Sequence, residues 1–138
     1  MASLTRGIFI VGAKRTPFGT FGGKLADKTC VDLQEVAAKA ALQSANVAPE
    51  LVDSVIIGNV LSSSSNDAPY ISRHVLLRCG IPIPVPALTI NRLCGSGFQS
   101  VVNGAHVSIE RLMVGCTCSQ IFHYLHCRIL LWVILKLP

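Results

Sequence analysis

The sequence predicts an α/β layered fold, with a largely parallel sheet and helices on both of its faces. Short apolar runs typical of strands alternate with segments whose apolar residues recur at helical spacing, in the order strand, helix, strand, helix, strand, helix. Glycine and proline separate these segments. The length of 138 residues fits one modest domain and is short for a complete two-domain enzyme.

The first strand and helix lie within the first 46 residues. Residues 8–11 form an apolar run that ends at Gly12 and fits a strand buried on both faces. Thr29 and Asp32 have the spacing of a capping box, which predicts a helix that begins there and stops near Asn46. The apolar positions of that helix are Leu33, Val36, Ala37, Ala40 and Ala41.

Two more strand and helix pairs follow. Residues 52–60 predict a second buried strand, and a polar loop at 62–67 leads to a helix with Pro69 in its first turn and Gly80 after its end. Prolines at 82, 84 and 86 force an extended path into a third strand at 87–91. A third helix follows Cys94. Its predicted apolar face is Phe98, Val101, Val102 and Ala105.

Composition narrows the class of protein. Charged residues make up only 14% of the chain and hydrophobic residues 51%, so we expect the surface to need a partner or additional sequence. The net charge of +5 suits an anionic ligand. The basic residues are scattered without aromatic interleaving, which argues against nucleic acid as a partner.

Cysteine usage and the first 28 residues bear on the compartment. Six cysteines occur without a secretory leader, which favours a reducing compartment over a disulfide framework. The first 28 residues carry five basic side chains and one acid, the charge bias of a mitochondrial entry segment. Because the first strand already starts near Gly7, we expect any targeting information to lie within the folded sequence.

Cys94 is the candidate nucleophile. It stands between a predicted strand and a predicted helix, with Gly95 and Gly97 to let the backbone bend sharply and a ligand approach. A thiol at a helix N-terminus experiences the positive end of the helix dipole, which favours the thiolate, and the N–H groups there can stabilise an oxyanion. The alternative is a small buried cysteine that fills space in front of a helix.

The residues around Cys94 resemble the nucleophile motif of the thiolase family. That segment is Asn91-Arg-Leu-Cys-Gly-Ser-Gly-Phe-Gln-Ser100, and it is most similar to the mitochondrial, degradative branch of the family. Further segments match in the same order, namely Arg15-Thr-Pro-Phe-Gly19, Asp53-Ser-Val-Ile-Ile-Gly-Asn-Val60 and Pro86-Ala-Leu-Thr-Ile90. The resemblance covers roughly residues 6–105, and it implies the N-terminal half of the thiolase layered fold, with an incomplete, mostly parallel sheet.

The resemblance also implies a reaction. Cys94 would take an acyl group from a 3-ketoacyl-CoA, releasing acetyl-CoA, and free CoA would then collect the shortened acyl chain, as in fatty acid β-oxidation. Coenzyme A is a substrate here, and no resident cofactor or metal is implied. The family further implies a homo-oligomer, a dimer or tetramer, in the mitochondrion. The residues that contact CoA are not identified by these motifs.

Other acid–base groups of the family lie in its C-terminal half. The chain contains no Gly-His-Pro, Cys-x-Gly-Gly-Gly or Asn-Glu-Ala-Phe segment, so a histidine base and a second cysteine are not assigned. His74 lies outside any family motif. His106 follows Cys94 by about three helical turns, roughly 18 Å at ~1.5 Å per residue, which is too far for a base.

Two further features allow a structural or a functional interpretation. Arg15 could meet a phosphate or a subunit partner, or serve as a structural loop arginine. The polar loop at 62–67 could border a ligand cleft or simply be solvated.

The end of the chain departs from the family pattern. We divide the chain into a truncated thiolase N-terminal domain at 1–107 and a divergent hydrophobic tail at 108–138, to which no domain is assigned. We expect the tail to have no defined place in the sheet, which would leave the sheet with an open edge. The alternative function is therefore an inactive truncated product that acts at most as an interaction or assembly fragment.

Two features of the tail invite a specific role. Cys and His residues crowd together, but without the separated ligand pairs of a zinc site. They are Cys116, Cys118, His123, His126 and Cys127. Residues 121–137 are strongly apolar, but they are shorter than the ~20 residues of a typical transmembrane helix and are interrupted by histidine and arginine, so we expect no membrane span.

Overall fold

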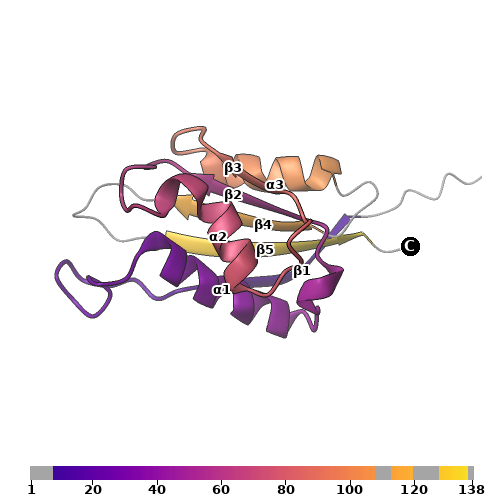
Figure 1. Ribbon diagram of the computed structural model, residues 1–138, viewed down its shortest axis with the longest axis horizontal. Helices are drawn as coiled ribbons and strands as arrows, with labels where there is room; N and C mark the ends of the chain where they lie inside the picture. The colour runs from indigo at the N-terminus through magenta and orange to yellow at the C-terminus, as the bar shows by residue number, and fades with distance from the viewer. Residues whose placement is uncertain (1–7, 108–112, 120–127, 137–138) are drawn as a thin grey trace, which may run out of the picture.

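The computed structural model describes residues 8–107, 113–119 and 128–136, with side chains for residues 8–107 (Figure 1). The elements in chain order are β1 (Ile8–Arg15), α1 (Cys30–Ser44), the 3-10 turn η1 (Pro49–Leu51), β2 (Ser54–Asn59), the 3-10 turn η2 (Ala68–Tyr70), α2 (Ile71–Arg78), β3 (Ala87–Ile90), α3 (Ser96–Val107), β4 (Met113–Ser119) and β5 (Arg128–Lys136). The predicted alternation of strands and helices over the first hundred residues is confirmed.

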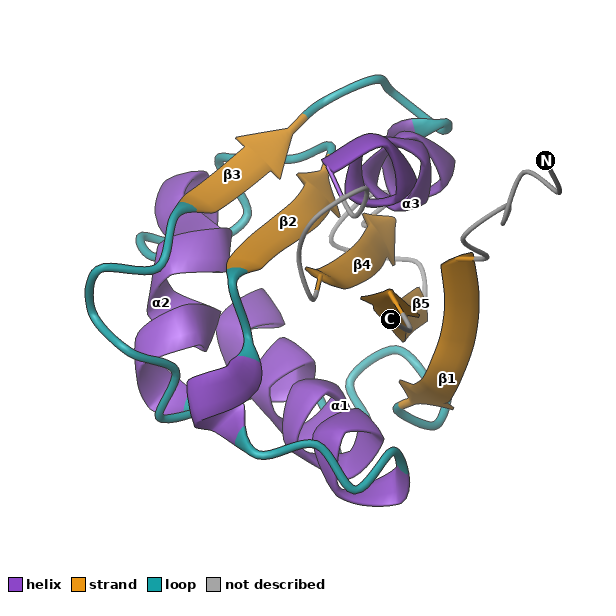
Figure 2. Ribbon diagram, turned by 90° about the vertical axis from the view of Figure 1, so that its right-hand side faces the viewer, coloured by secondary structure: helices purple, strands orange, loops and turns teal. Residues whose placement is uncertain are grey.

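The five described strands form one sheet in the order β1-β5-β4-β2-β3. β2 is parallel to both β3 and β4, while β5 is antiparallel to both β4 and β1. β1 therefore runs in the same direction as β2, β3 and β4, so the prediction of a mostly parallel sheet is confirmed. α1 and α2 cover one face and α3 covers the other (Figure 2).

The prediction that residues beyond about 110 have no place in the sheet is wrong. β4 and β5 occupy the two positions between β2 and β1, and both are paired on each side. The prediction was made because the sequence after residue 107 no longer resembles the thiolase family. Strand pairing, however, requires only an extended backbone and side chains that are compatible with a strand. Residues 128–136 consist largely of Ile, Leu, Val and Trp, and β-branched and aromatic residues favour strands.

α1 begins and ends where the sequence predicts. The backbone N–H of Asp32 donates to Thr29 Oγ1 at 3.2 Å, and the N–H of Thr29 donates to Asp32 Oδ2 at 2.9 Å, so both halves of the capping box are present. The helix ends at Ser44, and Asn46 then takes a positive φ of 53°. Of the predicted apolar positions, Leu33, Ala37 and Ala41 are buried, Ala40 is half-buried and Val36 is 63% exposed.

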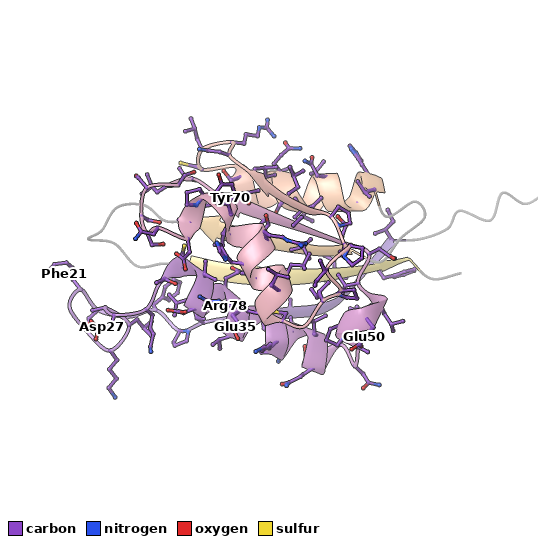
Figure 3. All side chains as sticks on the ribbon, in the orientation of Figure 1. Phe21, Asp27, Glu35, Glu50, Tyr70 and Arg78 are labelled. Carbon is purple, nitrogen blue, oxygen red and sulfur yellow. The ribbon has the colours of Figure 1, made fainter. Side chains whose placement is uncertain are left out.

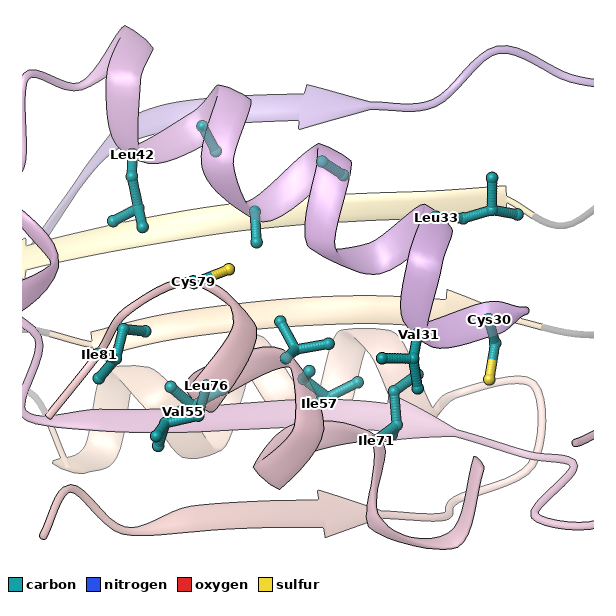
Figure 4. Close-up of a cluster of buried hydrophobic side chains, with 14 of the residues drawn as sticks. Cys30, Val31, Leu33, Leu42, Val55, Ile57, Ile71, Leu76, Cys79 and Ile81 are labelled. Atoms are coloured by element: carbon teal, nitrogen blue, oxygen red, sulfur yellow. The ribbon is translucent and has the colours of Figure 1, made fainter. Parts of the chain in front are cut away.

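The main hydrophobic core lies between β2 and the helices α1 and α2 (Figure 4). β2 is buried along its whole length, as predicted. Ile57, Ile71 and Leu76 are each fully buried and join the strand to α2. Because each such side chain contributes about 1.5–3 kcal/mol on burial, this cluster fixes the two helices on the sheet.

β1 differs from the prediction of a strand buried on both faces. Ile8, Phe9 and Ile10 are 41%, 49% and 52% exposed. β1 is an edge strand of the described sheet, with β5 on one side, and its register shifts between Ile10 and Gly12. An apolar run alone does not distinguish an edge from a central position, because that depends on which strands pair with it.

α3 faces the sheet with small residues. Its buried positions are Ser96, Ser100 and Gly104, spaced four residues apart, whereas Phe98 is 70% exposed. The predicted apolar face is wrong for Phe98, whereas Val101, Val102 and Ala105 are half-buried and Val101 packs against Ile56. Short side chains let the helix approach the strands closely, so packing distance decided which face turned inward.

A cluster of charged side chains joins α1 and α2, the two helices on the face of the sheet opposite α3. Arg78, at the end of α2, lies 2.7 Å from Asp32 and 3.6 Å from Glu35 of α1 (Figure 3). Arg78 also lies 4.0 Å from Asp67, whose Oδ2 accepts a hydrogen bond from Thr29 Oγ1 at 3.1 Å. These contacts tie the start of α1 to α2 and to the loop at 62–67 that precedes α2. None of the helices in the described residues combines the length and hydrophobicity that a transmembrane span requires.

Candidate nucleophile site at Cys94

Cys94 lies in the turn between β3 and α3, and its side chain is exposed. β2 and β3 are parallel, and their last pair joins Gly58, one residue before the end of β2, to Ile90, the last residue of β3, so both strands end at the edge of the sheet where this turn begins. The prediction of a thiol between a strand and a helix is confirmed as geometry. The alternative of a buried, space-filling cysteine at position 94 is wrong.

A short hydrogen-bonded turn, residues 92–96, carries the thiol. Gly95 N–H donates to Arg92 O at 3.0 Å, and Ser96 N–H donates to Leu93 O at 3.0 Å. Leu93, which immediately precedes the cysteine, has a positive φ of 48°. That left-handed conformation costs a residue with a side chain about 1–2 kcal/mol, so the surrounding contacts have to maintain it.

Ser96 supplies two of these contacts. Its hydroxyl donates to Leu93 O at 2.6 Å and accepts from Arg92 N–H at 2.8 Å, so one side chain spans both ends of the turn. Ser96 is 1% exposed. With no water available to replace it, a buried hydroxyl in this position has a larger effect than a surface one.

Asn91 ties the same turn to the neighbouring strand end. Its Oδ1 accepts from Leu93 N–H at 2.9 Å, and its Nδ2 donates to Val60 O at 3.1 Å. Leu93 is therefore held through its N–H by Asn91 and through its carbonyl by Ser96. The strained residue before the nucleophile is fixed from both sides.

Gly58 explains how closely α3 can approach β2. A Cβ atom built at Gly58 would lie 2.5 Å from the carbonyl carbon of Ser96 and 2.8 Å from the nitrogen of Gly97. Real side chains do not make such contacts with backbone. The glycine thus allows the start of α3, and with it the turn at 92–96, to rest directly on the strand.

The other described cysteines have a different environment. Cys30 and Cys79 are buried, in contrast to Cys94. Burial raises the pKa of the Cys79 thiol to about 11, with the charge of Glu35 adding to that effect and Lys39 opposing it. Cys79 is therefore a protonated thiol near neutral pH, and it packs in the main core.

The candidate histidines are not brought to Cys94. His74 is half-buried in α2, on the face of the sheet opposite α3 (Figure 2). His106 is exposed in the last turn of α3, at the far end of the helix that begins beside Cys94. The expectation that neither histidine is the base agrees with these positions.

Arg15 and the polar loop make structural contacts. The Arg15 guanidinium lies over the Phe18 ring, 4.6 Å from its centroid, and donates to Thr16 O at 3.1 Å. In the loop, Ser65 Oγ donates to Asp67 Oδ1 at 2.6 Å, and Asp67 in turn accepts from Thr29. These contacts give Arg15 and the loop a structural role, and the phosphate, partner or ligand-cleft interpretations of the two features stay predictions.

Metal binding has no support among the side chains of residues 8–107, where no group of three or more His, Cys, Asp or Glu side chains is placed to hold an ion. The Cys and His residues of the tail belong to segments whose side chains the structure does not describe. The sequence prediction against a zinc site there stays a prediction.

Sequence reasoning missed the roles of Ser96, Asn91 and Gly58. Ser96 and Asn91 were visible within the motif, and a serine in the first turn of a helix is a known partner for nearby backbone groups. Gly58 was visible only as a glycine near the end of a strand. Its contact with Ser96 joins residues 38 positions apart, which no local pattern signals.

The sequence of this chain is similar to that of known proteins. Residues 8–113 match the family model described as thiolase, N-terminal domain. The chain is 69% identical over 102 residues to 3-ketoacyl-CoA thiolase, mitochondrial, of Homo sapiens, a match that covers 74% of this chain and 25% of that protein. It is 64% identical over 109 residues to the protein of the same name from Bos taurus, covering 79% and 27% respectively.

A solved structure agrees with the sequence relatives. The crystal structure of human mitochondrial 3-ketoacyl-CoA thiolase in complex with CoA superposes with a TM-score of 0.77 and 59% identity, covering 82% of this chain and 29% of that one. The chain thus spans about a quarter of the length of the curated relatives it matches.

Proposed function

The chain belongs to the thiolase family through the N-terminal domain of that family, and on this premise we propose that Cys94 is the nucleophile of a thiolytic acyl transfer from 3-ketoacyl-CoA to CoA. The observation that carries the proposal is an exposed thiol on a strained turn, closed by hydrogen bonds of Ser96 and Asn91, at the start of α3. Such positions support covalent catalysis when an acid–base partner is nearby.

The chemistry proceeds in two balanced steps. The Cys94 thiolate attacks the 3-keto carbon, the bond between C2 and C3 breaks, and protonation of C2 releases acetyl-CoA. The thiol of a second CoA then attacks the acyl thioester on Cys94, releasing the shortened acyl-CoA and the free cysteine. Backbone N–H groups in the turn before α3, including that of Cys94, would stabilise the oxyanion in each step.

Substrate, compartment and assembly follow from the same premise. The solved human relative is described as a complex with CoA, and the curated human and bovine relatives are named mitochondrial. We therefore propose CoA esters as substrates of this chain's lineage and the mitochondrion as its compartment, in fatty acid β-oxidation. A homo-oligomer is supported by apolar side chains left exposed near the site, such as Leu93 at 71% and Phe98 at 70%.

The acid–base partners of the reaction are expected from the C-terminal half of the family, for which these 138 residues carry no matching motif. Losing one general acid or base typically lowers the rate by about 10²–10⁴-fold. We therefore expect these 138 residues alone to be slowly acylated at Cys94 by an activated thioester, without measurable multiple turnover.

The experiment separates the two parts of the proposal. Acylation is followed by intact mass and peptide mapping after incubation with acetoacetyl-CoA, and turnover by acetyl-CoA release in the presence of free CoA. A Cys94→Ala chain provides the blank. Acylation at Cys94 without turnover supports the proposal, whereas a label on Cys30 or Cys79 instead of Cys94 would refute the assignment of the nucleophile.

The alternative is an inactive truncated product that acts at most as an interaction or assembly fragment, and it rested on the missing C-terminal acid–base motifs and on an open sheet edge left by the tail. In the described sheet, β4 and β5 fill the positions next to β2 and β1. An open edge at those positions no longer supports that alternative, whereas the missing acid–base motifs remain consistent with an inactive truncated product.

A further inference from the structure

We infer that Arg92 is a specificity-determining residue of the Cys94 site, because its guanidinium places a positive charge beside the thiol and favours reagents and acyl donors that carry an anionic group. The inference deepens the proposed function and rests on it for the natural ligand, which would be the substrate of that same cysteine. A carboxylate on the acyl chain and a phosphate of CoA would both supply the anionic group.

The backbone of Arg92 is fixed within the turn at 92–96. Its N–H donates to Ser96 Oγ at 2.8 Å, and its carbonyl oxygen accepts from Gly95 N–H at 3.0 Å. Replacing the side chain of Arg92 leaves both contacts in place, because neither uses a side-chain atom of that residue. A substitution at this position therefore separates the effect of the guanidinium from the shape of the turn.

The side chain of Arg92 runs over Gly95, the residue that follows Cys94. Its Cγ and Cδ atoms lie 3.9 Å and 3.8 Å from the position of a Cβ built at Gly95. Its Nη1 donates to Gln99 Oε1 at 2.5 Å, and Gln99 Nε2 donates to Asn103 Oδ1 at 2.7 Å. Two polar side chains, one turn apart on α3, thus hold the guanidinium beside the start of the helix.

The charge of Arg92 is not neutralised by an acid within residues 8–107, where side chains are described. None of the ion pairs there involves Arg92. Residues 79–107, which include the whole of β3, the turn and α3, contain no Asp or Glu. A guanidinium carries several N–H donors and the contact with Gln99 uses one of them, so donors remain for a carboxylate or a phosphate.

Arg92 is close enough to act on a group bound at Cys94. Standard bond lengths and the contacts with Gly95 place the guanidinium carbon within roughly 12 Å of the Cys94 Cα. This distance is comparable with the Debye length of about 10 Å in 0.1 M salt and well inside the ~30 Å in 0.01 M salt. The attraction of an anion should therefore be strongest at low ionic strength and weaken as salt is added.

The alkylation rates of Cys94 by iodoacetate and iodoacetamide, resolved by peptide mapping, test the charge. The reagents share a leaving group but differ in charge, and the fraction of thiolate cancels in the ratio of their rate constants. We expect Arg92→Gln to lower the ratio of the iodoacetate to the iodoacetamide rate constant about two- to fivefold in 0.01 M salt, and by less than about twofold in 0.5 M salt. Arg92→Lys should keep the ratio near the parent value.

Arg73→Gln is the matched control. Arg73 donates to Ile83 O at 2.9 Å and belongs to α2, on the face of the sheet opposite α3 (Figure 2), so its loss changes the net charge equally but not the charge beside Cys94. An unchanged ratio in Arg92→Gln, or equal falls in Arg92→Gln and Arg73→Gln, would overturn the inference. A fall in Arg92→Lys as large as that in Arg92→Gln would also overturn it, because packing rather than charge would then be the cause.

Three acyl donors identify the source of the anionic group. Glutaryl-N-acetylcysteamine carries a carboxylate, butyryl-CoA carries phosphates, and butyryl-N-acetylcysteamine is neutral. We expect Arg92→Gln to slow acylation of Cys94 by an anionic donor about two- to fivefold relative to the neutral donor in 0.01 M salt. Slowing of the glutaryl donor assigns the carboxylate of an acyl chain, and slowing of butyryl-CoA assigns a phosphate.

The outcomes separate this inference from the proposed function. Equal rates for parent and Arg92→Gln with both anionic donors, or equal slowing of all three donors, would overturn the inference while leaving Cys94 as the nucleophile. If none of the donors acylates Cys94 but the alkylation ratio still depends on Arg92, the proposed acyl transfer is refuted and the anion preference of this thiol is supported.

Discussion

Ser96 Oγ lies 2.6 Å from the carbonyl oxygen of Leu93, the residue whose positive φ of 48° immediately precedes Cys94. The same hydroxyl accepts from Arg92 N–H at 2.8 Å. One buried serine therefore closes the turn that presents the thiol. This hydrogen bond holds Leu93 in its left-handed conformation and thereby fixes the orientation of Cys94, the next residue.

We predict that Ser96→Ala slows alkylation of Cys94 by iodoacetamide. Alanine leaves the Arg92 N–H without its acceptor, at a cost of about 1–3 kcal/mol, and relaxes the turn. A fall of about tenfold in the second-order rate constant corresponds to ~1.4 kcal/mol. The rate constant should be measured across pH, so that loss of positioning is separated from general loosening.

Ser100→Ala is the matched control for this variant. Ser100 is also fully buried in α3, and its Oγ donates to Gly97 O at 2.7 Å, one turn beyond the site. Both substitutions should lower thermal stability to a similar degree, but only Ser96→Ala should change Cys94 reactivity. Equal effects of the two variants on alkylation would show that Ser96 has no specific positioning role.

We predict a fixed order of cysteine reactivity in the described part of the chain. Cys94 is exposed, whereas Cys30 and Cys79 are buried. Because burial raises the pKa of Cys79 to about 11, its thiolate is scarce near neutral pH. Limiting alkylation followed by peptide mapping should label Cys94 before these two residues. Earlier labelling of Cys79 in folded protein would contradict both the burial and the raised pKa.

We predict that Gly58→Ala destabilises the protein and Gly95→Ala does not. The new Cβ at position 58 would lie 2.5 Å from the backbone of Ser96, so α3 would have to shift, at a typical overpacking cost of about 1–3 kcal/mol. At position 95 the nearest atom, Arg92 O, is 3.4 Å from the new Cβ, an ordinary contact. Thermal unfolding of both variants measures the difference, and an unchanged midpoint for Gly58→Ala would argue against the close approach of α3.

We predict a loss of stability in acid that depends on Asp32. The hydrogen bond from the Thr29 backbone, and then the Arg78 side chain, lower the pKa of Asp32 below its ordinary value of 3.8. The folded state therefore favours the carboxylate, so this contribution is present above about pH 4 and is lost as pH falls through the lowered pKa. The free energy of unfolding should be measured from pH 7 to pH 2.

Asp32→Asn provides the comparison for the acid titration. Asparagine cannot ionise, so the variant should be less stable than the parent at pH 7 and should approach it as the pH falls below 4. Because the side chain of Asp32 is 37% exposed, solvent screens its ion pair and the capping contacts account for most of the effect. A constant difference between parent and variant across this range would exclude Asp32 as the titrating group.

The sequence by itself determined the parts that depend on local order. The capping box of Thr29 and Asp32, the buried run of β2 and the position of Cys94 between a strand and a helix all follow from neighbours in the chain. Helix caps, apolar runs and glycine turns depend on residues that are close together in the sequence, so the sequence alone is sufficient to predict them.

Only the tertiary structure decided which faces are buried and which strands meet. It turned Phe98 outward, set Gly58 against Ser96, made β1 an edge strand and brought β4 and β5 between β1 and β2. Each of these outcomes depends on how closely distant segments approach and on which backbone groups remain to be paired. Close packing and complete hydrogen bonding are properties of the whole assembly of elements, so no single segment of sequence specifies them.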